Sequence, residues 1–156
     1  MSIPIDYSKL ETTPAIPEAG PMIESFRAIG YSIEAAVADI IDNSISAQAK
    51  NVWVNFEWKG TDSWLSIKDD GRGMDNDELV QAMRPGSKNP LDDRNSKDLG
   101  RFGLGLKTAS FSQCRMLSVI SKKENSNSVY WTWDLNFVNK TGKWNGINSV
   151  RKAVEM

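Results

Sequence analysis

Residues 32–50 read SIEAAVADIIDNSISAQAK, the most strongly patterned stretch of the chain. Ser32 is a good N-cap, since its hydroxyl can accept from a free amide of a first helical turn. Apolar residues and one serine recur on one side at helical spacing, which predicts an amphipathic helix from Ser32 to about Lys50. That side holds Ile33, Val37, Ile40, Ile41 and Ser44, and the opposite side holds Asp39, Asp42, Asn43 and Ser46.

Asp39 and Asn43 stand four residues apart, so both side chains leave the same face of the helix about one turn from each other. A carboxylate can orient or deprotonate a water molecule, and a carboxamide oxygen can ligate Mg²⁺, which prefers oxygen donors. A polar stripe is also the ordinary solvent-facing side of such a helix. The pair alone leaves both interpretations open.

Alternation of apolar and polar residues predicts a strand over 51–58, a turn over 59–62 and a second strand over 63–69, which together form a hairpin. The second strand runs into DDGRGM, residues 69–74. Glycines at 71 and 73 allow positive φ and close approach to a ligand, and Asp69 could accept from an exocyclic amine. A plain acidic turn is the alternative. Asp75 and Glu78 form a capping box that predicts a short helix.

Residues 100–108 read GRFGLGLKT and precede a helix expected over about 103–113. Glycines at a helix N-terminus expose amides and the positive helix end to phosphate, and Lys107 adds a cation. The spacing matches neither the Walker A motif nor the dinucleotide fingerprint, so a flexible helix entry is an equal alternative. Residues 85–100 form a long polar loop of the kind that is typically functional or disordered.

Two further strands are expected over 115–122 and 128–135, which gives an α+β domain with helices gathered on one face of a sheet. Four of the six prolines lie in 1–21, which predicts an extended arm before a folded domain over 22–156. We expect a cytoplasmic protein with no membrane partner, since no signal peptide or membrane-length apolar run is visible.

The composition excludes several kinds of site. The chain has 156 residues, a formal net charge of −1, one cysteine (Cys114) and no histidine. These counts exclude an internal disulfide, a cysteine-rich zinc site, a serine–histidine triad and histidine metal ligands. Any hydrolysis must therefore use carboxylates, amides, lysine or a bound metal. The near-neutral charge gives no support of its own for nucleic-acid binding.

The three motifs in this order resemble the GHKL superfamily of ATPases, which includes gyrase B, heat-shock chaperones, histidine kinases and MutL. AVADIIDNSISA at 36–47 is similar to the N-box of that superfamily, DDGRGM at 69–74 to its Asp-x-Gly-x-Gly motif, and LGRFGLGLKT at 99–108 to its second glycine box. The loop at 85–99 matches the ATP lid in position. Within the superfamily, the chain looks most like the Microrchidia (MORC) type and related bacterial ATPases.

The resemblance implies a Bergerat fold: a two-layer α/β sandwich with one mixed, mainly antiparallel sheet and helices on one face. It implies ATP or ADP with Mg²⁺ as ligands, with Asn43 on the metal and Asp69 on the adenine amine. Gly73 and Met74 would line the adenine pocket, and Gly71 of the same motif is also expected to bind the nucleotide. Lys107 would contact the γ-phosphate. The residues expected to hold the phosphates are Gly100, Arg101, Phe102, Gly103, Leu104, Gly105 and Leu106.

Aspartate stands at 39, where hydrolytic relatives usually carry glutamate, and it is one methylene shorter. The resemblance also implies a second domain that supplies a lysine, so we expect this chain to be the N-terminal part of a longer protein. Three functions follow: an ATP-hydrolysing switch that closes a lid and dimerises, a nucleotide-binding module without turnover, and a histidine-kinase catalytic domain. An acidic residue at 39 favours the switch. DNA is an expected partner of the longer protein.

Overall fold

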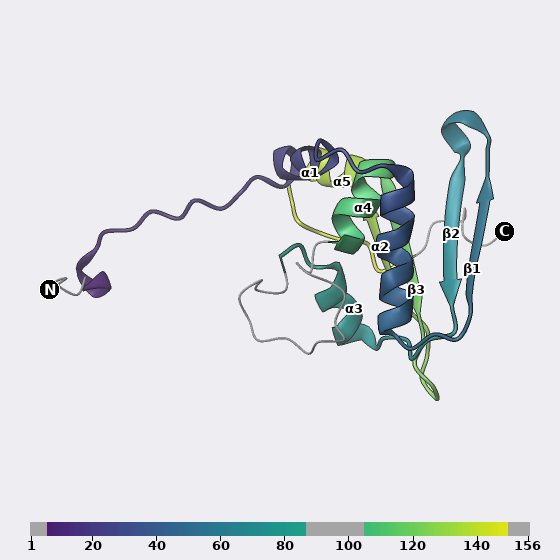
Figure 1. Ribbon diagram of the computed structural model, residues 1–156. Helices are drawn as coiled ribbons and strands as arrows, with labels where there is room; N and C mark the ends of the chain where they lie inside the picture. The colour runs from purple at the N-terminus through teal and green to yellow at the C-terminus, as the bar shows by residue number, and fades with distance from the viewer. Residues whose placement is uncertain (1–5, 87–104, 150–156) are drawn as a thin grey trace, which may run out of the picture.

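The computed structural model of the chain describes residues 6–86 and 105–149 (Figure 1). Most of the expected loop and five of the expected phosphate-binding residues, Gly100, Arg101, Phe102, Gly103 and Leu104, therefore lie outside the described residues. The described chain forms five α-helices, four strands and two short 3₁₀ turns, Tyr7–Lys9 and Gly60–Asp62. The predicted α+β class is confirmed.

Helix α2 (Ile33–Ser46) and helix α3 (Asn76–Met83) begin where the capping residues predict. Ser32 accepts a hydrogen bond from the Ala35 amide. In the capping box of α3, the Asp75 carboxylate accepts from the Glu78 amide and Glu78 accepts from the Asp75 amide. Helix α4 (Gly105–Gln113) begins within the glycine box. The caps of α2 and α3 satisfy amides that would otherwise lack a partner at the helix ends.

Two helices were not predicted. Helix α1 (Ala19–Arg27) places Pro21 in its first turn, where a missing amide costs no helical hydrogen bond. The extended arm therefore ends before Ala19 and not at Pro21. Helix α5 (Leu135–Thr141) is capped by Asp134, whose carboxylate accepts from two amides of the first turn, and ends at Gly142 in the left-handed region. The strand expected to reach residue 135 stops one residue earlier.

Strands β1 (Val52–Glu57) and β2 (Trp64–Asp69) form the predicted antiparallel hairpin, with Val52 opposite Asp69. Strands β3 (Met116–Ser121) and β4 (Val129–Asp134) form a second one, with Met116 opposite Asp134. The single mixed sheet that we expected is not observed: in the described part of the chain the two pairs are separate sheets. Figure 1 shows β1–β2 standing beside α2, apart from the rest of the domain.

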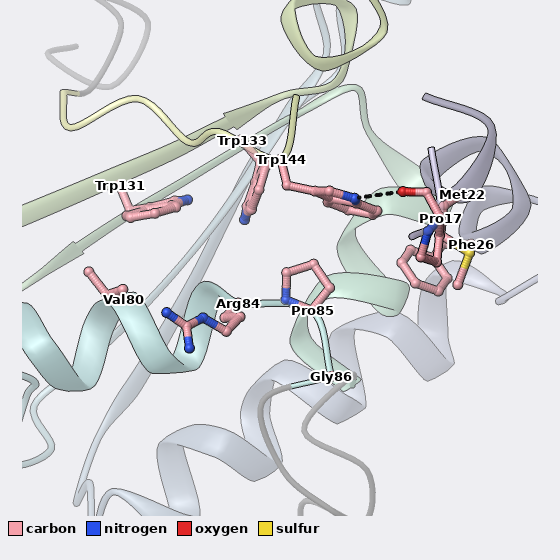
Figure 2. Close-up of a pocket in the computed structure, with 10 residues that line it drawn as sticks. All are labelled: Pro17, Met22, Phe26, Val80, Arg84, Pro85, Gly86, Trp131, Trp133 and Trp144. Atoms are coloured by element: carbon pink, nitrogen blue, oxygen red, sulfur yellow. Dashed lines mark hydrogen bonds between the residues drawn. The ribbon is translucent and has the colours of Figure 1, made fainter. Parts of the chain in front are cut away.

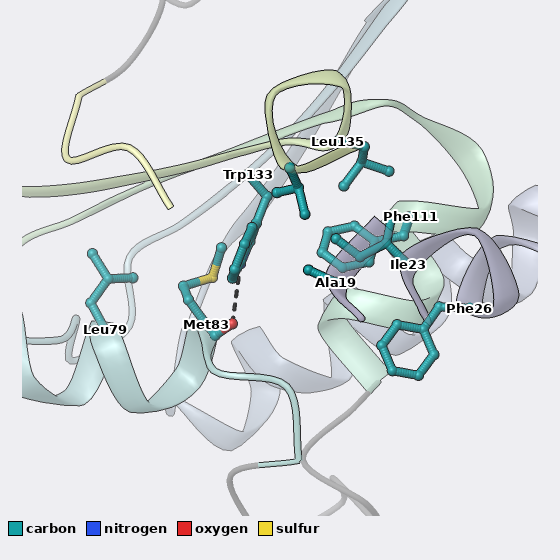
Figure 3. Close-up of a cluster of buried hydrophobic side chains, with 9 residues drawn as sticks. Ala19, Ile23, Phe26, Leu79, Met83, Phe111, Trp133 and Leu135 are labelled. Atoms are coloured by element: carbon teal, nitrogen blue, oxygen red, sulfur yellow. Dashed lines mark hydrogen bonds between the residues drawn. The ribbon is translucent and has the colours of Figure 1, made fainter. Parts of the chain in front are cut away.

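The hydrophobic core lies between α1, α3, α4, β4 and α5 (Figure 3). Trp133 is its largest fully buried side chain, and its indole donates to the Met83 carbonyl at 3.1 Å. Phe111 stands edge-on to Trp133 with 6.2 Å between ring centroids, a favourable geometry for aromatic pairs. By contrast, Ile33, placed by its spacing on the apolar side of α2, is 49% exposed.

No helix among the described residues is both long and apolar enough to cross a membrane.

Candidate functional site

Helix α2 carries Asp39, which is half-buried, and Asn43, which is exposed, one turn apart, as predicted. The Asn43 side-chain nitrogen donates to the Asp39 backbone carbonyl at 2.9 Å. A carbonyl can only accept, so this contact fixes the orientation of the amide and leaves its oxygen as the group available to a ligand. That oxygen suits a hard cation such as Mg²⁺. The described residues hold no group of three or more His, Cys, Asp or Glu side chains that could bind a metal ion.

Asp39 also lies beside the N-terminus of α4. A Cβ placed on Gly105, the first residue of that helix, would stand 3.8 Å from Asp39 Oδ2. The structure thus brings a carboxylate of the N-box-like segment next to the helix end that follows the glycine box. Helix N-termini attract anions, so this corner is suited to phosphate.

Asp69 stands at the end of β2 and is oriented by α2. Its Oδ2 accepts from Ser44 Oγ at 3.0 Å, and its Oδ1 accepts from the Gly71 amide at 2.9 Å. The side chain belongs to an exposed residue, while Ser44 is 3% exposed. A fixed carboxylate facing open space is suited to accept from a ligand amine.

Asp70 has a different role, which is to fix the start of β1. Its carboxylate accepts from the amides of Lys50 and Asn51 at 2.7 and 2.9 Å and from the Asn51 side chain at 2.8 Å. These bonds, the Asn51 amide first, hold the pKa of Asp70 below its ordinary value. The two neighbouring aspartates are therefore distinguished by geometry, one oriented and open, the other fully used in the fold.

The glycines of this motif are required by the protein itself. A Cβ on Gly71 would stand 2.8 Å from Ala47 Cβ and 2.9 Å from the Ala47 carbonyl. Gly73 has φ +67°, and a Cβ there would overlap the Lys122 carbonyl. The two glycines thus allow the backbone to pass close to the end of α2, at Ala47, and to the β3–β4 turn, at Lys122. No ligand is needed to explain it.

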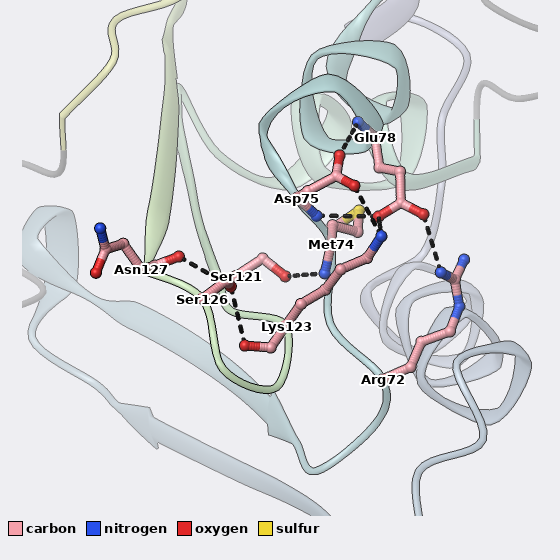
Figure 4. A network of polar contacts seen from close by, with 8 residues as sticks. All are labelled: Arg72, Met74, Asp75, Glu78, Ser121, Lys123, Ser126 and Asn127. Atoms are coloured by element: carbon pink, nitrogen blue, oxygen red, sulfur yellow. Dashed lines mark hydrogen bonds and ion pairs between the residues drawn. The ribbon is translucent and has the colours of Figure 1, made fainter.

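Figure 4 shows how this loop is attached to the β3–β4 turn. The Met74 amide donates to Ser121 Oγ at 2.8 Å, and Lys123 Nζ lies 2.7 Å from Asp75 Oδ2 and 2.8 Å from Glu78 Oε2. Arg72 pairs with the other oxygen of Glu78 at 3.0 Å.

These contacts change the acidity of the groups involved. Lys123, then the Asp75 amide, lowers the pKa of Glu78 from 4.5 to about 2. The pKa of Asp75 is also lowered, first by the Glu78 amide and then by Lys123. The pKa of Lys123 is raised, first by Asp75 and then by Glu78. The network is therefore fully charged at neutral pH.

Lys107, expected at the γ-phosphate, is 2% exposed, and its Nζ donates to the Ala82 carbonyl at 2.7 Å. Ala82 lies in the last turn of α3, where unpaired carbonyls attract cations. Its neighbour Leu106 packs against the core. The structure thus groups Asp39, Asn43, Asp69 and Gly105 around α2, and places Lys107 against the end of α3.

Three residues at the site were not predicted as functional: Ser44, Ser121 and Tyr31. Burial raises the pKa of the Tyr31 phenol, and the adjacent Asp39 carboxylate raises it further, so the phenol stays protonated beside Asp39. Ser44 carried a signal, since it was a polar residue on the apolar side of the predicted helix. Ser121 carried none, because its partner Met74 is 47 residues away in sequence. Tyr31 lies before the helix and has no place in its polar stripe.

A cavity of about 520 Å³ lies elsewhere, between α1, the end of α3 and β4 (Figure 2). Trp144 donates to the Pro17 carbonyl across its rim at 3.4 Å. The residues that line this cavity are Pro17, Met22, Phe26, Val80, Arg84, Pro85, Gly86, Trp131, Trp133 and Trp144. Among these described lining residues Arg84 alone is charged, and none is a predicted site residue. Such apolar walls do not suit a triphosphate.

The sequence profile of the histidine kinase-, DNA gyrase B- and HSP90-like ATPases matches residues 31–155, which include all three motifs. The chain belongs to this ATPase family. The GHKL resemblance inferred from the motifs is therefore confirmed.

Individual relatives of this ATPase domain agree with that assignment. The domain is 31% identical to ATPase morc-1 of Caenorhabditis elegans over 90 residues, which are 58% of this chain and 10% of the relative. It is 30% identical over 109 residues to the DNA mismatch repair protein MutL of Buchnera aphidicola, covering 69% of this chain and 19% of MutL. It is 32% identical over 97 residues to MutL of Halobacterium salinarum, covering 61% of this chain and 15% of that MutL. The chain thus spans less than one fifth of the length of these relatives.

Proposed function

We propose that this GHKL domain binds Mg-ATP between the exposed face of α2, the end of β2 and the N-terminus of α4, and acts as a switch in a longer ATPase. The observation that carries the proposal is the convergence of three distant motifs on α2. Asp69 Oδ2 is bonded to Ser44, and Asp39 Oδ2 lies beside Gly105. Asp69 and Gly105 thus each adjoin a residue of α2, the helix that also presents Asn43.

Each residue has a chemical role in this proposal. Asp69, held by Ser44, accepts from the adenine amine, while Gly71, Gly73 and Met74 form the adjacent wall. The Asn43 amide oxygen ligates Mg²⁺, which neutralises phosphate charge when it is bound. The amides at the start of α4 hold phosphate oxygens together with the segment 100–104. Lys107 leaves the Ala82 carbonyl for the γ-phosphate when ATP is bound.

Asp39 is the proposed general base for hydrolysis. It lies one turn from Asn43 and beside the phosphate-suited helix end, so a water on the γ-phosphate would be within reach of a carboxylate there. The shorter aspartate favours slow turnover. Binding without hydrolysis is therefore the second candidate function, and the two candidates share the same nucleotide site.

The longer protein would use the nucleotide to change shape. We propose that ATP orders the lid at 85–99 and drives homodimerisation, and that the remainder of the polypeptide binds DNA. The relatives include a DNA mismatch repair protein and the ATPase morc-1, and the first of these supports the proposal that the remainder of the polypeptide binds DNA. We also propose that the two hairpins join into one Bergerat sheet. The close approach of Gly73 to Lys122, which brings the chain just after β2 to the end of β3, supports this.

Thermal unfolding with and without Mg-ADP tests the proposal. A ligand that binds only the folded state adds about 2.7 kcal/mol of stability at a hundredfold excess over Kd. For a domain of this size we expect Tm to rise by about 5 to 10 °C. Mg-tripolyphosphate, which lacks adenine, serves as the control and should raise Tm less. An unchanged Tm at millimolar Mg-ADP would contradict the proposal.

A further inference from the structure

Ser121, which ends β3, and the next two residues of the β3–β4 turn contact three consecutive residues of the segment that follows β2. Ser121 Oγ accepts from the Met74 amide at 2.8 Å, the Lys122 carbonyl faces Gly73, and Lys123 Nζ pairs with Asp75 at 2.7 Å (Figure 4). The loop is therefore fixed on this side by a segment nearly fifty residues away in sequence. On its other side the Arg72 amide donates to the Ala47 carbonyl at 3.0 Å.

Lys123 makes the charged contacts of this attachment. The capping box of α3 brings the Asp75 and Glu78 carboxylates together, and their negative charges repel each other. Lys123 Nζ lies 2.7 Å from one carboxylate and 2.8 Å from the other, and so offsets this repulsion. The Arg72 guanidinium pairs with the other oxygen of Glu78. Without Lys123, the two carboxylates would push the start of α3, and Met74 with it, out of position.

We infer that Lys123 is a positioning residue for the nucleotide base, which fixes Met74 and the loop at 71–75 so that the site discriminates adenine from guanine. The inference rests on the proposed nucleotide site. Lys123 itself contacts the two carboxylates and not the nucleotide. It acts through Asp75 and Glu78, which fix the backbone of the loop that forms the adenine wall.

The test compares Lys123→Met, which removes the charge and keeps an apolar stem, with Lys122→Met. Lys122 is exposed and its side chain forms no ion pair among the described residues, so it is a matched control. Calorimetry with Mg-ADP and Mg-GDP gives affinities at a temperature where every variant is folded. We expect Lys123→Met to weaken ADP binding about threefold to tenfold and to reduce the ADP-to-GDP affinity ratio. Lys122→Met should change neither, and Lys123→Arg should restore most of the ratio.

Hydrogen exchange of the nucleotide-free protein supplies a second readout. The Met74 amide should exchange faster in Lys123→Met, while amides in β1, such as that of Val54, should not change. An ADP-to-GDP ratio equal to that of the wild type, or unchanged Met74 exchange, would overturn the inference and leave the nucleotide site standing. Failure of the wild-type protein to bind ADP would instead reject the proposed function, and the inference with it.

Discussion

Ser44 donates a hydrogen bond of 3.0 Å to Asp69, so α2 orients the carboxylate that ends β2. The two residues lie 25 positions apart in the sequence and belong to different motifs. This contact couples the helix that presents Asp39 and Asn43 to the proposed acceptor of the adenine amine. The contact and its neighbours can each be tested by substitution.

Substitution of Ser44 by alanine should free the Asp69 carboxylate. We expect the free energy of unfolding to fall by about 0.5–1.5 kcal/mol, because one hydrogen bond is lost while the exposed Asp69 remains hydrated. Affinity for Mg-ADP should fall as well. Ser46→Ala is the control, since Ser46 is exposed and forms no side-chain hydrogen bond among the described residues. Urea unfolding and calorimetry measure the two effects. Equal behaviour of the two variants would show that the contact orients nothing.

Gly73 should tolerate no side chain. Alanine there would combine a positive φ of +67° with overlap against the Lys122 carbonyl, so we expect a loss of about 3 kcal/mol or more. Gly60 is the matched control, because it has φ +57° and a Cβ added there would meet no described atom within 4 Å. Gly60→Ala should cost only the backbone strain, about 1 kcal/mol. Urea unfolding that gave both variants the same loss would refute the close packing described at Gly73.

The ion network predicts a specific acid sensitivity. The pKa of Glu78 is lowered from 4.5 to about 2 by Lys123 and the Asp75 amide, so the stability from these contacts is complete above pH 4.5 and is lost as the pH falls toward 2. Glu78→Gln should therefore make the free energy of unfolding less dependent on pH in that window. Glu124→Gln, at an exposed glutamate without an ion pair among the described residues, should leave the dependence unchanged. Urea unfolding across the window measures both.

Hydrolysis should depend on Asp39 in the longer protein. Asp39→Ala should reduce phosphate release at least about 100-fold and leave ATP affinity within a few fold, because the carboxylate serves the water and not the nucleotide. Asp42→Ala, at an exposed carboxylate on the same polar side of α2, is the control. Asp39→Glu should retain activity or raise it. This chain alone should turn ATP over barely above background. Undiminished phosphate release by Asp39→Ala would remove Asp39 from the mechanism.

Local signals in the sequence predicted most elements of the fold, and long-range contacts account for what was missed. The Ser32 cap and the Asp75–Glu78 box predicted α2 and α3. Alternation predicted the β1–β2 hairpin, and the strands β3 and β4 were also expected, since these patterns act over a few residues. Helix α1 was not predicted because prolines precede it and one, Pro21, lies within it. A proline in the first turn does not break a helix. The separation of the hairpins, the burial of Lys107 and the attachment of Met74 to Ser121 depend on tertiary packing, which no local pattern encodes.

The most direct test of the nucleotide site compares Asp69→Asn with Asp70→Asn. Asp69 is oriented toward open space by Ser44 and Gly71, whereas Asp70 accepts three hydrogen bonds within the fold. Asp70→Asn should therefore lower the free energy of unfolding more than Asp69→Asn does. Calorimetric titration with Mg-ADP should then show the reverse order for affinity. We expect binding by the wild type, a loss of at least about tenfold in Asp69→Asn and little change in folded Asp70→Asn. Equal ADP affinity in the two variants would contradict the central claim that Asp69 recognises the nucleotide.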